Sequence, residues 1–323
     1  MSYKDYKNNA TKTDDLKKAL ADTQNAAGGF VKDPDEWYPQ GDKSDSGYAI
    51  IRFLPGPEVE EKDFIHYWTH EFKNKKNGEW YFENCLSTLG NPDPVGKFNA
   101  KLWNMSDDDK SPERTQAREQ KRKLYYRANV FVIADPQNPE NNGKIKKFKF
   151  GAALFDFIKN AMNPKVLPGL TPPTPFNPFN LITGANFRIV FYKEDGYRKY
   201  GKSQFDPNGP LFDNEDRMET VYNAINEDKK WSLKQYIDPS KFKTYEALNK
   251  RLIEVLGYDW ENPQTPVRDL PSSTPKSNNV RQKDDSPRDE ERLKQTTKTK
   301  EAPKEAEKIE SDEDFFNSLA EEG

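Results

Sequence analysis

Cationic and aromatic side chains alternate between residues 114 and 151 of this chain. The stretch holds ten Lys and Arg against three acids, although the whole chain has a net charge of -3. Lys and Arg can replace the counterions of a phosphate backbone, and flat rings can stack on unpaired bases. Single-stranded nucleic acid is therefore the leading candidate ligand. The alternative is a solvated edge strand that its lysines keep from aggregating, with tyrosines that belong to the core.

A hairpin is expected to position these groups. Residues 128 to 133 are β-branched or aromatic and precede Asp135-Pro136, a turn signal, so they predict a strand buried on both faces. After a polar stretch the chain returns through residues 144 to 150, which predict the second strand. A second cationic turn, residues 73 to 78, is expected to join two further strands.

The remaining pattern predicts many short strands and few helices. Strands are expected at residues 47–54, 64–72, 79–83, 185–193 and 197–205, and helices at 113–123, 151–162, 215–226 and 244–256, with one helical turn in 98–105. We expect a mainly β fold with peripheral helices (α+β), and an OB-fold, a partly open barrel, is the natural candidate for the core.

Composition limits the classes of protein to consider. Hydrophobic and charged residues each make up 33% of the chain, so a sizeable part is expected to lie outside any core. The single cysteine excludes a disulfide framework. The N-terminus lacks the apolar segment of a signal peptide, and no run reaches the eighteen or so apolar residues of a membrane span. We expect a protein of a cytoplasm-like compartment, with no membrane association.

Several short segments, in their order and spacing, carry a resemblance to a known family. They are Ala49 to Pro55, Phe72 to Cys85, Lys121 to Lys123 ahead of Tyr126 to Asn129, Asp135-Pro136 with Pro139 to Asn141, Gly143-Lys144, and Gly184 to Phe187. The chain resembles, over most of residues 30 to 258, the replicative single-stranded DNA-binding (helix-destabilising) proteins of T-even-type bacteriophages.

The resemblance implies a division of the chain by role. It implies an arm at residues 1–30 for cooperative self-association, an OB-fold core at 31–258 that binds single-stranded DNA without sequence preference, a disordered linker at 259–304 and an acidic tail at 305–323. That tail would recruit phage replication, recombination and repair proteins in the cytoplasm of an infected bacterial host. The basic residues of the arm are scattered among acids here, where the family has a compact run, so the chain departs from the family in the segment implied for cooperative self-association.

The resemblance also implies contact residues. Carried over by position, the nucleic-acid contacts would be Lys121, Arg122 and Lys123 with phosphates, and Tyr126, Phe148, Tyr197, Tyr200 and Trp103 with bases, together with Arg127. This arginine stands where the family has a tryptophan, and a guanidinium can also stack on a base.

Residues 196 to 203 match the phosphate-binding loop pattern G-x-x-x-x-G-K-S. That loop opens a long helix whose N-terminus faces the phosphates. Here Ser203 is followed by a segment with Pro207, Gly209 and Pro210, which cannot begin such a helix. We therefore set aside a nucleotide hydrolase, although that enzyme, a metal-dependent nuclease and a structural phage protein remain the alternatives to a non-enzymatic binder.

Zinc is a second candidate that the sequence argues against. The family carries a structural zinc on one His and three Cys, and His70 and Cys85 stand at two of these positions. Closed structural sites take four nitrogen or sulfur ligands, whereas this chain holds two His and one Cys. Asp93 could substitute in principle. We expect no cofactor, with His70 and Cys85 as vestigial positions in the core.

The C-terminal 19 residues hold eight acids and one Lys. Residues 311 to 314 form a capping box, and Phe315, Phe316 and Leu319 would share one face of a helix. One interpretation is a solubilising polyanion. We expect instead a dual role, in which the tail competes with phosphates for the basic residues and its three apolar residues bind partners by folding on them.

Overall fold

The computed structural model describes residues 33–60, 62–165, 171 and 173–262, which separate into two compact units. Unit 1 comprises the residues up to Trp68 together with Leu124–Lys241, and unit 2 comprises Thr69–Lys123 with the residues from Phe242 onward. The predicted core of residues 31–258 therefore spans both units. The predicted arm and tail, with Phe315, Phe316 and Leu319, lie outside the described residues.

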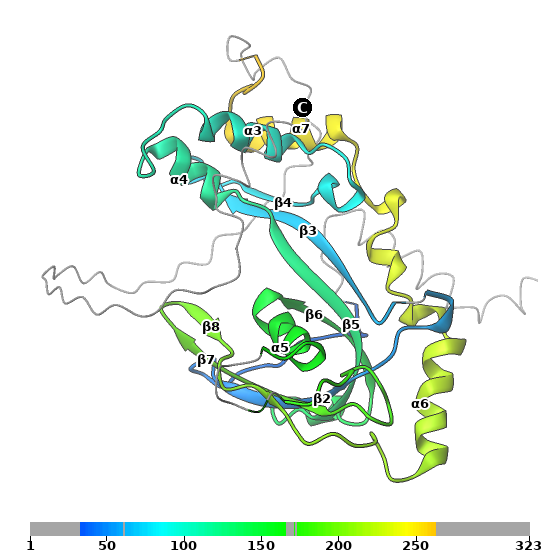
Figure 1. The fold of residues 1–323 in the computed structure, drawn as a ribbon. Helices are drawn as coiled ribbons and strands as arrows, with labels where there is room; N and C mark the ends of the chain where they lie inside the picture. Colours follow the sequence, from blue (N-terminus) through cyan, green and yellow to red (C-terminus); the bar gives the residue numbers. More distant parts are fainter. Residues whose placement is uncertain (1–32, 61, 166–170, 172, 263–323) are drawn as a thin grey trace, which may run out of the picture. The chain divides into compact units, whose positions relative to one another are not determined.

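The sheet of unit 1 is mixed and mainly antiparallel (Figure 1). In spatial order its strands are β1 (Glu36–Trp37), β6 (Ile145–Gly151), β5 (Lys123–Ala134), β2 (Gly47–Phe53), β7 (Asn186–Glu194) and β8 (Tyr197–Lys199). Strand β9 (Gln204–Phe205) pairs with β7, and the short contact between β1 and β6 is parallel. Helix α5 (Ala152–Met162) lies between β6 and β7 in sequence.

The prediction of a strand buried on both faces is confirmed for β5. Its six residues from Arg127 to Val132 are all buried. Val130 and Val132 belong to the main core cluster of the unit, whereas Phe131 belongs to a second cluster with residues of α6 (Glu215–Glu227). Alternating side chains of a strand point to opposite faces, so β5 separates two apolar layers.

In its described residues, unit 2 contains a hairpin and three α-helices. The hairpin joins β3 (Phe64–Lys73) to β4 (Trp80–Asn84), and β3, like β5, is shared in sequence with unit 1. The helices are α3 (Pro94–Trp103), α4 (Pro112–Glu119) and α7 (Tyr245–Leu256). Their core gathers rings and aliphatic side chains from all of these elements, among them Phe72, Tyr81, Phe98, Trp103, Leu252 and Trp260.

Helix ends in unit 2 follow local chemistry. Asp93 accepts hydrogen bonds from the backbone N–H groups of Val95 and Gly96, and Pro94 supplies the first helical residue of α3. Thr244 caps α7, which ends at Gly257 in the left-handed conformation that favours glycine (φ 78°). These caps explain why α3 begins four residues before the predicted helical turn.

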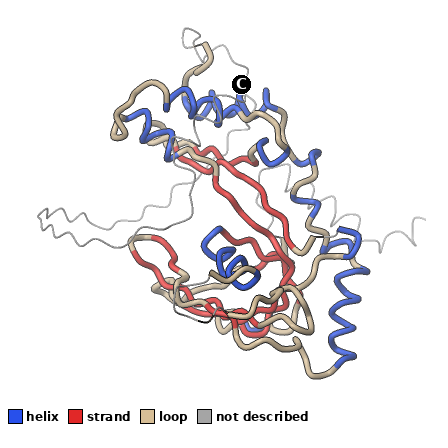
Figure 2. Tube along the Cα trace, in the orientation of Figure 1, coloured by secondary structure: helices blue, strands red, loops and turns tan. Residues whose placement is uncertain are grey.

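Short 3-10 helices complete the described chain, coloured with the other helices in Figure 2. They span Glu58–Glu60, Leu86–Leu89, Pro139–Asn141, Lys229–Trp231, Lys234–Tyr236 and Pro239–Lys241. The mixed sheet with helices confirms the expected mainly β fold with peripheral helices. None of the helices in the described residues combines the length and the apolar character needed to cross a membrane.

Candidate nucleic-acid interface

The basic triplet, residues 121 to 123, links α4 to β5. Helix α4 ends at Glu119, so the predicted helix is too long by four residues, and Lys123 already begins the strand. Lys121 and Arg122 are half-buried and Lys123 is exposed. The ammonium group of Lys123 lies 3.4 Å from a carboxylate oxygen of Glu71. Half of the Lys123 side chain is exposed, so its charge lies at the surface.

Tyr126 follows the triplet on β5 and lies in a group of rings. Its ring stacks on that of Phe155, with centroids 3.8 Å apart and planes 9° apart, and on Phe150 at 5.9 Å. Burial raises the pKa of the Tyr126 hydroxyl, and the charge of Asp156 raises it further. The ring is therefore neutral at physiological pH, half-buried and held in place by its neighbours.

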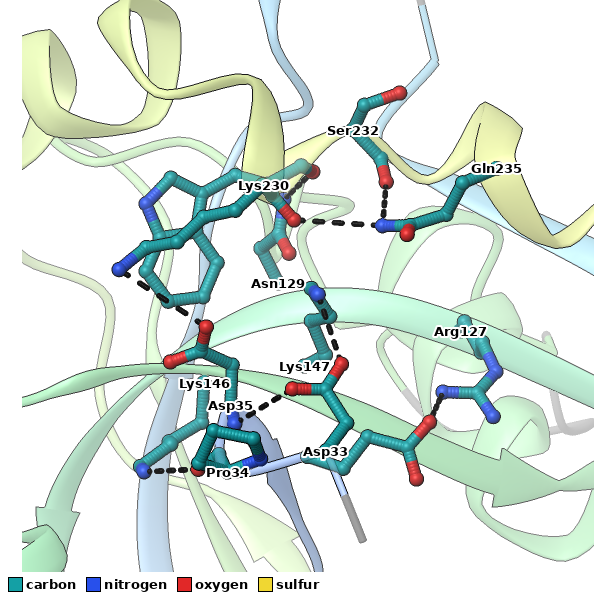
Figure 3. Close-up of polar contacts among 12 residues, drawn as sticks. Asp33, Pro34, Asp35, Arg127, Asn129, Lys146, Lys147, Lys230, Ser232 and Gln235 are labelled. Carbon is teal, nitrogen blue, oxygen red and sulfur yellow. Dashed lines mark hydrogen bonds and ion pairs between the residues drawn. The ribbon is translucent and has the colours of Figure 1, made fainter. Parts of the chain in front are cut away.

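Arg127 does not present its guanidinium to solvent. Its Nη1 lies 2.5 Å from a carboxylate oxygen of Glu36, its Nε donates to the Tyr67 hydroxyl, and the guanidinium carbon lies 3.8 Å from the centroid of the Tyr236 ring. Burial lowers the pKa of Arg127, but Tyr67, Tyr236 and Glu36 together raise it above its usual value. In this structure the predicted stacking partner of a base is a buried ion-pair residue (Figure 3).

Other cations of the β5–β6 hairpin are also engaged in holding unit 1 together. The Lys147 ammonium lies 3.0 Å from a carboxylate oxygen of Asp33, with only 4% of the Lys147 side chain exposed. Lys146 donates to the carbonyl oxygen of Pro34, and Figure 3 shows this bond together with the contact between Lys147 and Asp33. Lys149 lies over the ring of Tyr125. A count of cations in the sequence therefore overstates the charge available to a ligand.

Phe148 and Trp103, both predicted to stack on bases, lie in the two cores. Each is 2% exposed. Phe148 packs against Trp37 and Phe150, with ring centroids 5.3 and 5.0 Å away. The guanidinium carbon of Arg114 lies 4.5 Å from the centroid of the Trp103 ring. Because protein covers both rings, we assign them to packing and leave them, with Arg127, out of the interface proposed below.

The β7–β8 hairpin presents two tyrosines. Tyr197 is 75% exposed beside a turn in which Asp195 and Gly196 both have positive φ. Tyr200 is half-buried and packs on the main core, with its ring near that of Phe191. Arg198 fixes the hairpin through an ion pair with Asp45 and a hydrogen bond of 2.9 Å to the carbonyl oxygen of Pro39. The hairpin thus presents the exposed Tyr197 ring on a backbone that the contacts of Arg198 hold in place.

The same hairpin contains the sequence that matched a phosphate-binding loop. Its first glycine lies in the turn, and Ser203 is buried, with its hydroxyl accepting from the N–H of Val190 and donating to the carbonyl oxygen of that residue. The next element is the two-residue strand β9. In the described chain no helix begins at Ser203, so this segment lacks the helix N-terminus that a phosphate-binding loop requires.

His70, Cys85 and Asp93 come together in the core of unit 2. All three are buried, and their candidate ligand atoms lie within 4.8 Å of one another. The Nδ1 of His70 lies 2.9 Å from the carbonyl oxygen of Gln120, and Nε2 lies 3.2 Å from Oδ1 of Asp93. Nδ1 faces an acceptor and Nε2 lies beside a carboxylate, an arrangement that favours the cationic imidazole. Burial lowers the pKa of His70, but Asp93 and Cys85 raise it to about 10.

This cluster does not fit a closed structural zinc site. It offers three donors among the described residues, where such a site takes four. The carboxylate of Asp93 also accepts hydrogen bonds from the backbone N–H groups of Leu86, Val95 and Gly96, at 3.0, 2.9 and 3.3 Å. The geometry is that of a buried ion pair that joins β3 to the start of α3.

Two exposed rings were missed by the sequence reasoning. Trp80 and Phe82 of β4 are each 57% exposed, and Tyr81 between them is fully buried. The signal was present in the sequence, because three successive aromatic residues in a strand cannot all face one core. The sequence also shows that both residues closely follow the cationic turn of residues 73 to 78.

Comparison with known proteins adds the last evidence. Residues 45–256 match the family model described as gp32 DNA binding protein like. The chain is 33% identical over 250 residues to the single-stranded DNA-binding protein of Enterobacteria phage T2, which covers 76% of this chain and 78% of that protein. It is 32% identical over 249 residues to the protein of the same name from Enterobacteria phage T4, with the same coverage. A shorter match, 40% identical over 92 residues, covers 28% of this chain and 80% of the single-stranded DNA-binding protein of Escherichia phage SV14.

Proposed function

Because this chain belongs to the family of gp32-like DNA-binding proteins, we propose that it binds single-stranded DNA without sequence preference and coats it during phage DNA replication, recombination and repair. The relatives from phages T2 and T4 carry the name single-stranded DNA-binding protein. We propose a binding role without catalysis.

One observation carries the proposal: Lys123 begins strand β5 with an exposed cationic side chain, and Tyr126, three residues later on the same strand, has a ring that is fixed but partly exposed. The residues at 121 to 123 would contact phosphates, and each contact releases a condensed counterion. Tyr126 would stack on a base, and its packing on Phe155 means that little ring freedom is lost on binding. Neither contact depends on which base is present.

The β7–β8 hairpin would supply further stacking surface. Tyr197 has the most exposed ring among the large hydrophobic residues of the described chain, and Tyr200 lies three residues later. Lys199 and Lys202 stand beside the two tyrosines in sequence. The residues of the proposed interface are Lys121, Arg122 and Lys123 in unit 2, and Tyr126, Tyr197 and Tyr200 in unit 1.

We also propose that unit 1 is an OB-fold. In its sheet the spatial order is β6, β5, β2, β7, β8, so β2, which comes first of these five strands in sequence, lies in the centre. In sequence, α5 comes between β6 and β7, the third and fourth of the five. An OB-fold is a five-stranded, partly open Greek-key barrel with such a helix, and it presents a strand face and loops to oligonucleotides.

Residues outside the described part complete the proposal. We propose self-association along DNA through residues 1–30, and recruitment of phage replication, recombination and repair proteins through residues 305–323, with Phe315, Phe316 and Leu319 as the docking residues. The protein would act in the cytoplasm of an infected bacterial host.

A comparison of single-stranded and duplex DNA tests the function. Fluorescence anisotropy of a labelled oligothymidylate at low salt should give a much smaller Kd than a labelled duplex of equal length. Tyr197→Ala should weaken binding of the single strand, whereas Tyr38→Ala, at an exposed tyrosine outside the proposed interface, should not. Equal affinity for both forms of DNA would contradict the proposal.

A further inference from the structure

Strand β4 presents two large aromatic rings to solvent on one face. Trp80 and Phe82 are each 57% exposed, and they are two residues apart, so their side chains leave the same side of the strand. Strand geometry separates them by about 6.8 Å. Exposed rings that are grouped in this way mark an interaction surface more often than isolated ones do.

The residue between the two rings holds the strand to the core. The ring of Tyr81 stacks on that of Phe72, with centroids 5.0 Å apart and planes 9° apart, and its hydroxyl donates to the carbonyl oxygen of Leu248. Arg251 donates to the backbone carbonyl oxygen of Trp80. The backbone under both exposed rings is therefore fixed without the rings themselves entering the core.

The same face carries more positive than negative charge. Register places Lys73 opposite Trp80 and Glu71 opposite Phe82, and the Lys73 ammonium lies 5.9 Å from the centroid of the Trp80 indole. Each nearby acid is paired with a cation: Glu71 with Lys123 (3.4 Å), Glu79 with Arg251 (3.5 Å) and Glu83 with Lys243 (2.5 Å). Lys73 and Lys76 form no ion pair within the described residues, which leaves a surplus of cations beside the rings.

We propose that Trp80 and Phe82 form a second base-stacking subsite for single-stranded DNA, with Lys73 and Lys76 at its phosphates. The inference rests on the proposed function and extends it to the β3–β4 hairpin of unit 2. Glu71 links the subsite to the basic triplet, because it lies opposite Phe82 and pairs with Lys123. The subsite lies within one compact unit, because unit 2 includes all of its residues and the two that link it to the triplet: Trp80, Phe82, Lys73, Lys76, Glu71 and Lys123.

Spacing and charge favour a single strand over other occupants. The separation of the two rings is about twice the 3.4 Å rise per base of a duplex strand, and duplex bases keep their faces covered by stacking. An extended single strand can place successive unstacked bases on both rings, and aromatic stacking accepts any base. An acidic peptide would share the charge complementarity but would have no use for two flat rings at this spacing.

Trp80 also makes the subsite observable. Among the six tryptophans of the chain, Trp37, Trp103, Trp231 and Trp260 are buried and Trp68 is half-buried, whereas Trp80 is 57% exposed. The full-length chain and its variants would be titrated with an oligothymidylate of about 16 nucleotides. Anisotropy of a label on the DNA reports affinity, and tryptophan emission reports stacking. The thermal midpoint of each variant checks folding.

Replacing Trp80 by Ala and by Phe separates the stacking ring from the fluorophore. Trp80→Ala and Phe82→Ala should each weaken binding roughly 5- to 100-fold, since one stacked base is lost. Trp80→Phe keeps an aromatic ring, so it should bind within a few-fold of the unchanged chain and yet lose most of the DNA-induced quenching. Met105→Ala, at an apolar side chain of unit 2 that is 63% exposed, is the matched control and should change neither signal.

The outcomes separate the subsite from the function. If the unchanged chain binds the oligonucleotide but Trp80→Ala and Phe82→Ala bind as tightly as Met105→Ala, the subsite is refuted and the proposed function stands. Full quenching in Trp80→Phe would also refute it. If the two alanine variants keep DNA affinity but lose binding of a Glu-rich peptide, the face docks protein and the subsite is again refuted. If the unchanged chain does not bind at all, the proposed function fails and the subsite fails with it.

Discussion

Replacing Asp93 by Asn removes one charge from the buried ion pair of unit 2. The side chains of His70 and Asp93 are 3% and 2% exposed, so solvent hardly screens their attraction. Loss of one partner from a buried pair typically costs about 3–5 kcal/mol, because the other charge is left uncompensated. Asn also cannot accept at both former carboxylate oxygens, so the N–H groups of Leu86 and Val95 cannot both keep their bonds. We expect Asp93→Asn to lower the free energy of unfolding by about 3 kcal/mol or more near pH 6.

The pair also fixes the direction of the pH dependence. The pKa of His70 is raised from 6.5 to about 10 on folding, so the folded state binds the additional proton between these values. Its contribution to stability is therefore complete below pH 6.5 and declines as the pH rises toward 10, by up to about 1.4 kcal/mol per pH unit. The pKa of Asp93 is lowered although burial opposes this, because His70 and the backbone donors hold the charged form. Its contribution is present above pH 3.8 and is lost in acid.

Urea unfolding followed by circular dichroism at several pH values between 6 and 9 would measure both effects. The free energy of unfolding of the unchanged chain should fall as the pH rises, and Asp93→Asn should flatten this slope. Asp107→Asn, at a fully exposed carboxylate of the same unit, is the matched control and should leave the slope unchanged. If Asp93→Asn retains the full slope, the His70 imidazolium does not depend on this carboxylate and the reasoning is refuted.

The other predictions concern metal, DNA contacts and the tail. A domain whose fold depends on a bound metal unfolds when the metal is chelated. We expect this fold to stand without metal, so its thermal midpoint should not respond to EDTA. A fall of many degrees, or stoichiometric zinc in the purified protein, would contradict this. Arg122→Ala should reduce the salt dependence of binding to single-stranded DNA, whereas Tyr126→Ala should cost roughly 1–3 kcal/mol of binding with the salt slope nearly unchanged; equal slopes in both variants would count against the separation of phosphate and base contacts. Removing residues 305–323 should raise DNA affinity most at low salt and abolish partner recruitment in pull-down assays, while Phe315→Ala with Phe316→Ala should impair recruitment alone. Unchanged affinity of the truncated chain at every salt concentration would rule out competition by the tail.

Elements with strong local signals could be predicted from the sequence. Residues 128 to 133 identified the doubly buried strand because β-branched and aromatic residues fill both of its faces. The predicted helix at 151–162 matches Ala152–Met162, and the predicted helix at 244–256 matches Tyr245–Leu256. Periodicity and terminal signals act over a few residues, so the sequence contains what is needed to place these elements.

The exposure of single rings and cations could not be predicted in the same way. Arg127 is buried because Glu36 and Tyr236, each about a hundred positions away in sequence, meet it in the fold. Trp103 is covered by Arg114, whose position depends on how two helices pack. Such partners are set by tertiary structure, and no local pattern distinguishes a core tryptophan from one that stacks on a base. Two boundaries between the units, after Trp68 and after Lys123, likewise have no local sequence signal, because each lies within a continuous strand, β3 or β5.

The salt dependence of binding tests the central claim most directly. The association constant of the full-length chain for an oligothymidylate, measured across a range of NaCl concentrations, should fall linearly on logarithmic axes, with a slope of about -0.7 for each phosphate that a cation neutralises. A slope corresponding to several phosphates, together with weaker binding to duplex DNA at every salt concentration, is the predicted result. An association constant that does not change with salt, or no association at low salt, would contradict the account.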